Sequence, residues 1–210
     1  MKSYGQFCGL ARSLDTVGDR WNLLIVRQLL IGLARYGDLR AGLPGLATNL
    51  LADRLRDLES AGVVRREVAA NGNAVAYALT EWGAELREPI EALIRWSTPL
   101  MVEGPRTDHF DPGWLHVALP ALLRERARGR RTVTIGLAVD GAPLLLRVSR
   151  SGPTVEAADG RAVDATVRTS AHVLLGLAAG ALTLADAQAW GAVEVEGDLD
   201  AVREVLAGAA

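Results

Sequence analysis

The segment GLATNLLADRLRDLESAGVVRR, residues 45–66, constrains the fold more than any other part of the sequence. Within it Leu51, Leu55 and Leu58 recur at the i, i+4 and i+7 spacing of one helical face, while polar residues occupy the opposite face. An apolar stripe of this kind has to be covered by other elements of the same domain. The segment therefore predicts an amphipathic helix whose outer face is either solvated or used for recognition.

The residues around this helix predict a helical domain that ends at about residue 101. Thr48 is expected to cap the helix, and Ala61-Gly62 to end it. Asn71-Gly72 lies between two extended runs, which is a strong hairpin signal. The other predicted elements are helices at Arg12–Val17, Trp21–Ile31 (buried stripe Trp21, Leu24, Ile25, Leu29) and Tyr36–Leu43, strands at Val63–Val68 and Val75–Leu79, and a helix from Thr80 to about Leu100 (stripe Leu86, Ile90, Leu93) that Pro89 is expected to kink.

Helix, helix, short helix, turn, helix and hairpin is the element order of a winged helix-turn-helix. A helix about 10 to 12 Å in diameter fits the major groove of DNA, and the hairpin can lie along the neighbouring backbone. Under this hypothesis Thr48, Asn49, Ala52 and Arg56 face base edges, and Arg40, Arg65 and Arg66 hold phosphates.

The alternative is that the polar face is only solvated. Asp53 and Asp57 lie close enough to Arg56 to form ordinary intrahelical ion pairs, and their carboxylates would repel phosphate. The formal net charge of −2 gives no general signal for nucleic acid, and the 12 Lys and Arg residues before position 105 are matched by 12 Asp and Glu. Any DNA binding has to depend on a local surface.

The first half resembles the HxlR branch of bacterial winged-helix regulators over nearly all of residues 8–96. The resemblance is carried by CGLARSLDTVGDRWNLLIVRQLLIG, RYGDLRAGLPGLATNLLADRLRDLESAGVV and AYALTEWG, in that order. It implies a homodimer, joined by the N-terminal segment and the helix after the wing, that binds a palindromic operator in double-stranded DNA. The wing tip departs from the pattern, because Asn71-Gly72-Asn73 has no basic residue and so does not favour contact with the minor groove.

Cys8 is the only cysteine, which excludes an internal disulfide and a cysteine-based zinc site. It occupies the position at which some members of the resembled family carry a redox- or electrophile-sensing thiol. Arg12, one turn later, would lower the pKa of the thiol if both lie on one helix face. The alternative, which we favour, is a small packing residue at a dimer interface.

The second half predicts a separate α+β domain. After a linker at residues 103–111, Trp114–Arg126 reads as an apolar helix that Pro120 kinks or begins, with Leu115, Leu119, Leu122 and Leu123 on its stripe. The other predictions are two alternating strands joined at Asp140-Gly141 (Val133, Ile135, Leu137 and Val139 on one face; Leu144, Leu146 and Val148 on the other strand), a strand at Ala162–Arg168, a helix His172–Ala179 capped by Ser170, a capping box at Thr183 and Asp186, and a helix Ala201–Leu206.

Residues 112–207 resemble a sterol carrier protein 2-like domain, most specifically in DATVRTS from position 164 and in GAVEVEGD from position 191. The fold expected for the whole chain is thus α+β: a winged helix-turn-helix domain over 1–102, and over 112–210 a sterol-carrier-like domain in which helices cover an antiparallel sheet. The resemblance implies a hydrophobic small-molecule ligand, for which the predicted lining is Trp114, Leu119, Leu122, Val173, Leu174, Leu177 and Trp190. The alternative for each of these residues is plain core.

Several classes of protein are not favoured. His109, His116 and His172 lie in different segments without metal-ligand spacing, and no nucleophile elbow, phosphate loop or placed carboxylate pair is present, so we expect neither an enzyme nor a metal or other cofactor. The longest apolar run, Leu23–Ala34, is interrupted by Arg27 and is too short to span a bilayer. No signal-peptide pattern is visible, so a cytoplasmic protein is expected.

The leading hypothesis is a dimeric transcriptional regulator, acting as a repressor, whose operator affinity is controlled by an apolar effector. The helix that contains Pro89 and Trp96 is the expected transmission element. Two alternatives stay open: an apolar metabolite carrier or buffer that uses the winged helix only to dimerise, and a regulator that senses thiol chemistry through Cys8.

Overall fold

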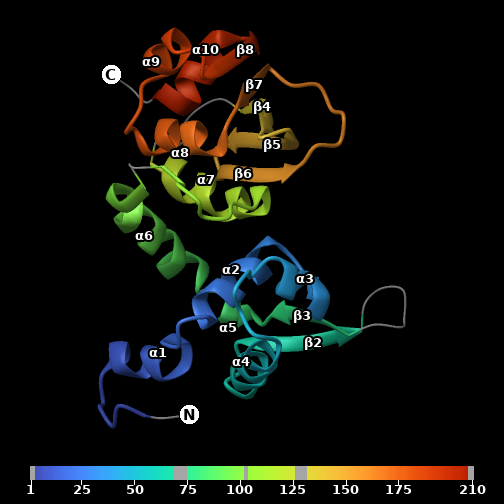
Figure 1. The fold of residues 1–210 in the computed structure, drawn as a ribbon, viewed down its shortest axis with the longest axis vertical. Helices are drawn as coiled ribbons and strands as arrows, with labels where there is room; N and C mark the ends of the chain where they lie inside the picture. Colours follow the sequence, from blue (N-terminus) through green and yellow to red (C-terminus); the bar gives the residue numbers. More distant parts are fainter. Residues whose placement is uncertain (1–2, 69–74, 102–103, 126–131, 208–210) are drawn as a thin grey trace. The chain divides into compact units, whose positions relative to one another are not determined.

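The structure is a computed structural model that describes residues 3–68, 75–101, 104–125 and 132–207 (Figure 1). The chain divides into two compact units, Met1–Ile90 and Glu91–Ala210. The predicted wing tip at residues 71–73 lies outside the described residues. The boundary between the two units, at Ile90 and Glu91, falls inside the helix Arg87–Ser97. The domain boundaries at residues 102 and 112 therefore remain predictions.

The first unit has the winged helix-turn-helix fold that the sequence predicted. Its described elements are α1 (Gly9–Val17), α2 (Asn22–Ile31), β1 (Ala34–Arg35), α3 (Tyr36–Ala41), α4 (Thr48–Ser60), β2 (Val64–Val68), β3 (Val75–Leu79) and α5 (Glu81–Ala84). β1 and β2 both pair antiparallel with β3, so the sheet order is β1-β3-β2. The two-residue strand β1 was not predicted.

The apolar stripe predicted for α4 is confirmed. Leu51, Leu55 and Leu58 are all buried. Ile25 of α2 and Leu39 of α3 are fully buried as well. Burial of a leucine side chain stabilises a fold by about 1.5 to 3 kcal/mol, and the stripe therefore fixes which face of α4 points outward.

Two local predictions in the first unit were wrong. The N-cap of α4 is Ala47, which is extended, and Thr48 is already the first helical residue. In α2 the buried stripe contains Asn22 in place of Trp21, and Leu24 is 37% exposed. An apolar pattern misses this shift because Asn22 is polar; its side-chain amide is accommodated by donating to the Thr16 carbonyl oxygen at 3.0 Å.

The single kinked helix expected after Thr80 is in fact two helices. Thr80 caps α5 as predicted, accepting a hydrogen bond from the Gly83 N–H, but α5 ends at Ala84 and α6 (Arg87–Ser97) begins three residues later. Pro89 lacks the N–H that a continuous helix would need, and it is tolerated here because it lies in the first turn of α6. A short helical turn, η1 (Thr98–Met101), follows α6.

The second unit consists of a mixed sheet with helices. Its described elements after α6 and η1 are η2 (Pro112–Trp114), α7 (Leu115–Leu123), β4 (Val133–Val139), β5 (Ala142–Ser149), β6 (Gly152–Ala157), β7 (Ala165–Thr169), α8 (Ala171–Ala179), α9 (Leu184–Ala189), β8 (Val193–Gly197), α10 (Leu199–Val202) and η3 (Arg203–Ala207). The strand order is β6-β5-β4-β7-β8. Strand β6 was not predicted, and Pro120 lies inside α7.

The sheet is mostly antiparallel, with one departure from the prediction. β4 and β5 form the predicted hairpin, and both residues of its turn, Asp140 and Gly141, have positive φ (49° and 83°). A two-residue turn of this type matches the twist of the strands that it joins. β4 and β7, however, pair in parallel, with Ile135 opposite Ala165, so the sheet is not purely antiparallel as expected.

One apolar core fills the second unit. The predicted face of β4, Val133, Ile135, Leu137 and Val139, is buried throughout. Helices α7 and α8 lie together near the sheet in Figure 1, and their buried leucines belong to the same cluster as those strand residues. The predicted caps are also confirmed, because Ser170 accepts from the Val173 N–H and Thr183 from the Asp186 N–H.

Candidate functional site

Two polar contacts fix α4 within the first unit. The Tyr36 hydroxyl, at the start of α3, donates to the Thr48 carbonyl oxygen at 2.6 Å. The Arg54 guanidinium pairs with Asp19, between α1 and α2, and with Asp57 at 3.4 Å. Because the Arg54 side chain is only 20% exposed, we assign it a structural role. Together with the buried leucine stripe, these contacts hold the outer face of α4 in one orientation.

Helix α4 carries four of the predicted DNA-contact residues. Thr48, Asn49 and Arg56 are exposed and Ala52 is half-buried. Asn49 and Arg56 lie on the side away from the leucine stripe and Ala52 on its flank, whereas Thr48, seven residues before Leu55 in the first turn of α4, lies on the side of the stripe. Asp53 shares the outer face with Asn49 and Arg56 and forms an ion pair with Arg56, one turn along the helix. The intrahelical pair weighed in the sequence is therefore present, on the surface proposed for reading bases.

The other predicted DNA contacts are distributed over two further elements. Arg40 is exposed in the last turn of α3. Arg65 and Arg66 are consecutive in β2, so their side chains point to opposite faces of the hairpin. Arg65 pairs with Glu67 at 2.5 Å and donates to the Leu79 carbonyl oxygen at 2.6 Å, whereas Arg66 pairs with Glu59 at 2.9 Å. A single DNA backbone lying along one face of the hairpin can use only one of the two.

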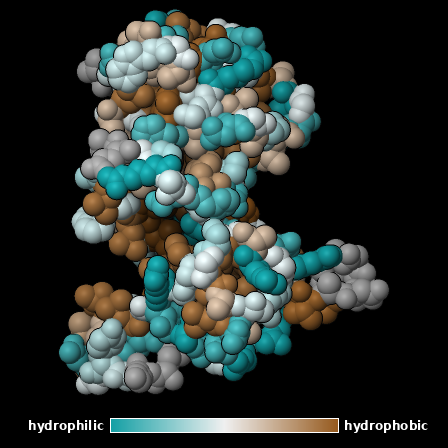
Figure 2. All heavy atoms as spheres, viewed as in Figure 1, coloured by the Kyte–Doolittle hydropathy of each residue, from teal (hydrophilic) through white to brown (hydrophobic). Residues whose placement is uncertain are grey.

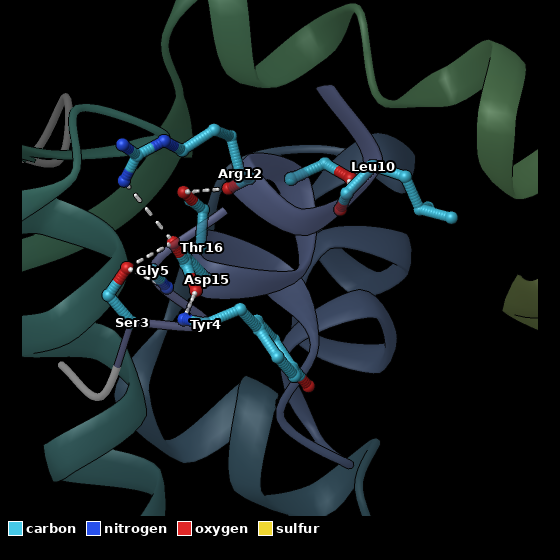
Figure 3. Close-up of polar contacts among 8 residues, drawn as sticks. Ser3, Tyr4, Gly5, Leu10, Arg12, Asp15 and Thr16 are labelled. Carbon is cyan, nitrogen blue, oxygen red and sulfur yellow. Dashed lines mark hydrogen bonds and ion pairs between the residues drawn. The ribbon is translucent and has the colours of Figure 1, made fainter. Parts of the chain in front are cut away.

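The N-terminal segment is fixed to α1 through Asp15 (Figure 3). The Asp15 carboxylate accepts hydrogen bonds from the Tyr4 N–H at 2.8 Å and the Ser3 hydroxyl at 2.9 Å, and Arg12 lies 3.6 Å away. These partners, the Tyr4 N–H first, lower the pKa of Asp15 below its ordinary value. The carboxylate therefore remains charged at neutral pH and ties the segment that precedes α1 to the helix.

Cys8 is exposed, at the N-cap of α1. The backbone N–H groups of Ala11 and then Leu10, at the open start of the helix, lower the pKa of its thiol. Arg12 was expected to have this effect, but its guanidinium is directed to Asp15. The thiol is thus accessible in a single chain and its thiolate is stabilised by the helix start.

Apolar side chains are exposed on α1 and on α6 with the turn that follows it. Figure 2 shows brown, hydrophobic surface in the regions where Figure 1 labels these helices. The largest exposed fractions are those of Phe7 (104%), Leu10 (68%), Trp96 (74%) and Leu100 (74%). Leu93, predicted to be buried, is 47% exposed. Within each unit, exposed apolar side chains of this size are typical of a surface that another chain covers.

Most residues predicted to line a ligand site belong to the core of the second unit. Leu119, Leu174 and Leu177 are fully buried in it, and Leu122 and Val173 pack against it with partial exposure. Trp114 lies at the start of α7. Its ring is edge-on to the rings of His109 and Phe110, at centroid distances of 5.8 and 5.9 Å. Trp190, at the end of α9, is 71% exposed and is not part of the cluster.

A buried ion pair joins α6 to α7 inside the second unit, which begins at Glu91. The Glu91 carboxylate is 2.7 Å from the Arg124 guanidinium, and its side chain is 2% exposed. One turn later, Arg95 donates to the Ala121 carbonyl oxygen at 3.3 Å. At the other end of α6, within the first unit, Arg87 donates to the Leu30 carbonyl oxygen at 3.0 Å. The ends of α6 are therefore fixed to different cores.

The described residues contain no cluster of three or more His, Cys, Asp or Glu side chains arranged to hold a metal ion. Among the helices described, none is both long and apolar enough to cross a membrane.

Sequence reasoning missed the contacts that orient α4. The Tyr36–Thr48 and Arg54–Asp19 pairs join residues 12 and 35 positions apart, and no periodicity connects them. It also placed Glu91 and Arg124 in unrelated helices. The Asp53–Arg56 and Arg54–Asp57 pairs, by contrast, had a local signal, the i, i+3 spacing.

Two protein families match the chain. The HxlR-like helix-turn-helix family matches residues 16–104, and the SCP-2 sterol transfer family matches residues 120–207.

Several individual relatives are named HTH-type (helix-turn-helix) transcriptional regulators. The HTH-type transcriptional regulator YvaP of Bacillus subtilis (strain 168) is 36% identical over 88 residues, which is 41% of this chain and 82% of YvaP. YodB, an HTH-type transcriptional regulator of the same organism, is 33% identical over 93 residues, 44% of this chain and 83% of YodB. The solved structure of the redox regulator HypR in its oxidized form is 29% identical, covering 44% of this chain and 96% of HypR, with a TM-score of 0.41.

Proposed function

The chain belongs to the HxlR-like helix-turn-helix family of transcriptional regulators and carries an SCP-2-type second domain, and from this premise we propose how it works. It is a homodimer that binds a palindromic DNA operator in the cytoplasm. A hydrophobic small molecule, bound in the second domain, controls its affinity for that operator. The observation that carries the proposal is the fixed, polar outer face of α4, on a domain joined by one helix to a second core.

The outer face of α4 is the proposed DNA-reading surface. Asn49 and Arg56 offer the amide and guanidinium groups that pair with adenine and guanine edges in the major groove. Arg40 and one of the two β2 arginines, Arg65 or Arg66, supply phosphate contacts that position the helix. Most of these arginines already have carboxylate partners, so we expect few phosphate contacts and a shallow dependence of affinity on salt.

The exposed apolar residues of α1, of the segment just before it, and of α6 form the proposed dimer contact. Covering Phe7, Leu10 and Trp96 removes large apolar surfaces from water. A two-fold dimer presents two α4 helices to two half-sites, and this symmetry is the reason for a palindromic operator.

The second domain is the proposed effector site. Its core joins Leu119 of α7 to Leu174 and Leu177 of α8, with Leu122 and Val173 at the margin. An apolar molecule that enters between these helices replaces leucine–leucine contacts with its own, so its chemistry should be hydrophobic or aromatic. Trp114 is the proposed aromatic contact beside α7, and Trp190, which is exposed, would have to move to take part.

Helix α6 is the proposed transmission element. In its first turn Arg87 donates to the Leu30 carbonyl oxygen near the end of α2, and Glu91 and Arg95 are bonded to Arg124 and Ala121 at α7. A ligand changes an equilibrium only by binding two states differently. An effector that shifts α7 therefore acts on α6, and through it on the spacing of the two α4 helices. We propose that the effector lowers operator affinity, so that the protein is a repressor.

A second candidate function follows from Cys8. Its thiol is exposed and its pKa is lowered, which are the two requirements of a thiol sensor. In that case oxidation or alkylation of Cys8, beside the proposed dimer contact, would control DNA binding. Serine at position 8 would then abolish the response to oxidant and leave DNA binding itself unchanged.

The test is a titration of labelled DNA from immediately upstream of the protein's own gene, with random DNA as competitor, at two salt concentrations. We expect saturable binding that resists competitor and that Arg56→Ala weakens by about 1 to 3 kcal/mol, roughly 5- to 150-fold. Arg161→Ala, which removes a surface arginine of the second unit paired with Asp159 and Glu156, is the matched control and should bind normally. Equal loss of both DNAs as salt rises would instead favour a metabolite carrier.

A further inference from the structure

A carboxylate lies at the centre of the proposed DNA-reading face. Asn49, Asp53 and Arg56 follow one another at i, i+4 and i+7 spacing, on the side of α4 opposite its buried leucines. The Asp53 and Arg56 side chains are 47% and 64% exposed and are paired with each other. A negative charge at this place needs an explanation, because it faces a polyanion.

The pair does not serve the fold as the neighbouring ion pairs do. Arg54, 20% exposed, joins α4 to Asp19 in the turn between α1 and α2, and Arg66 of β2 pairs with Glu59 at the end of α4. Asp53 and Arg56, by contrast, bond to no second element within the described residues. Their arrangement is therefore free to serve what α4 contacts outside the chain.

The chemistry of the major groove tells where a carboxylate can be placed. At the phosphate backbone it is repelled. Among base edges, the N4 amino donor of cytosine has an acceptor on one side only, the O6 of its paired guanine. The N6 donor of adenine lies between two acceptors, its own N7 and the O4 of the paired thymine, whose lone pairs repel a carboxylate. Guanine presents two acceptors there, which suit the fork of an arginine. A carboxylate at the centre of the face thus favours cytosine.

We propose that Asp53 is a specificity-determining residue that accepts a hydrogen bond from cytosine N4 and holds Arg56 on a guanine in the adjacent base pair. Asp53 and Arg56 are three residues apart, which is about 4.5 Å along the axis of α4. This distance is close to the rise of about 3.4 Å between successive base pairs, so the two side chains can reach neighbouring base pairs. The inference rests on the proposed function, since it names the bases that the same surface reads.

The experiment selects bound sequences from a random double-stranded DNA library with the full-length protein and with Asp53→Ala and Arg56→Ala. Wild type should enrich a half-site with a cytosine and a guanine in adjacent base pairs. Asp53→Ala should reduce the preference for that cytosine from roughly tenfold to under about twofold, and Arg56→Ala should do the same for the guanine. Far-UV circular dichroism checks that the variants remain folded.

The matched control is Asp57→Asn, which removes an equal charge from the flank of α4 while Asp19 still holds Arg54. It should leave both base preferences unchanged. If Asp53→Ala keeps the cytosine preference and binds every sequence more tightly, Asp53 is only a repulsive charge and the inference is wrong, although the regulator function stands. A wild-type protein that enriches no sequence overturns both.

Discussion

Replacing Arg124 with methionine should destabilise the second unit by about 2 to 4 kcal/mol. The substitution removes the guanidinium 2.7 Å from a carboxylate that is 2% exposed. Loss of one partner of a buried ion pair typically costs about 3 to 5 kcal/mol, because a charge then remains in a place from which water is excluded. We expect a somewhat smaller destabilisation than this typical loss, because the Arg124 side chain is 34% exposed and solvent partly screens the pair.

The reverse substitution should cost much less. Glu91→Met removes the buried charge and fills its place with an apolar side chain, while the partly exposed guanidinium of Arg124 can turn toward water. We expect a loss of about 1 kcal/mol, and for the double variant a loss no larger than that of Glu91→Met. The unequal exposure of the two side chains therefore predicts both the size of the three losses in stability and their order, with Arg124→Met the largest.

Urea denaturation measures these differences. With a slope of about 1.5 kcal/mol per molar urea, the Arg124→Met loss corresponds to a shift of about 1.3 to 2.7 M in the midpoint of the second unit's transition. Equal losses for the two single variants, or a double variant whose loss is the sum of the singles, would refute the assignment of Glu91 as the buried charge of the pair.

Three further predictions concern the first unit. Leu55→Ala should cost about 2 to 5 kcal/mol in urea unfolding, because Leu55 is 1% exposed in the core under α4, and a loss below 1 kcal/mol would contradict that position. Gly83→Ala should cost at least about 1 to 3 kcal/mol, since its Cβ would lie 2.0 Å from the Val63 carbonyl oxygen, whereas Gly37→Ala, with open space at its Cβ, should be neutral or stabilising. The alkylation of Cys8 by iodoacetamide should reach half its maximal rate at a lower pH in the folded protein than in the urea-unfolded chain, because the N–H groups at the start of α1 stabilise the thiolate. Identical pH profiles for the two states would show that these N–H groups do not stabilise it.

Local patterns predicted the parts of the fold that depend on neighbouring residues. The leucine stripe of α4, the Asp140-Gly141 hairpin and the caps at Ser170 and Thr183 all follow from spacings of seven residues or fewer, and all are confirmed. The outward side of α4, on which Asn49 and Arg56 are proposed to contact DNA, followed from the same stripe, because burying one side of a helix decides which residues lie on the other.

The features that were missed depend on distant residues. Strand β1 is two residues long and exists only because β3 offers it a free edge. The parallel pairing of β4 with β7 crosses two intervening strands, and hydrophobic alternation carries no sign of direction. Leu93 is periodic in its helix and yet 47% exposed, since periodicity marks an apolar face without telling whether the same chain covers it.

The parallel pairing of β4 with β7 also has a consequence for the order in which the chain assembles. The wing strands β2 and β3 can pair soon after synthesis, because Val68 pairs with Val75, only seven residues later. Ile135, by contrast, pairs with Ala165, which is synthesised 30 residues later. Long-range closure is slow, and domains fold in the order in which they leave the ribosome. Each newly made chain therefore completes its DNA-binding half first, and the arrival of β7 sets the earliest time at which its second half can respond to anything.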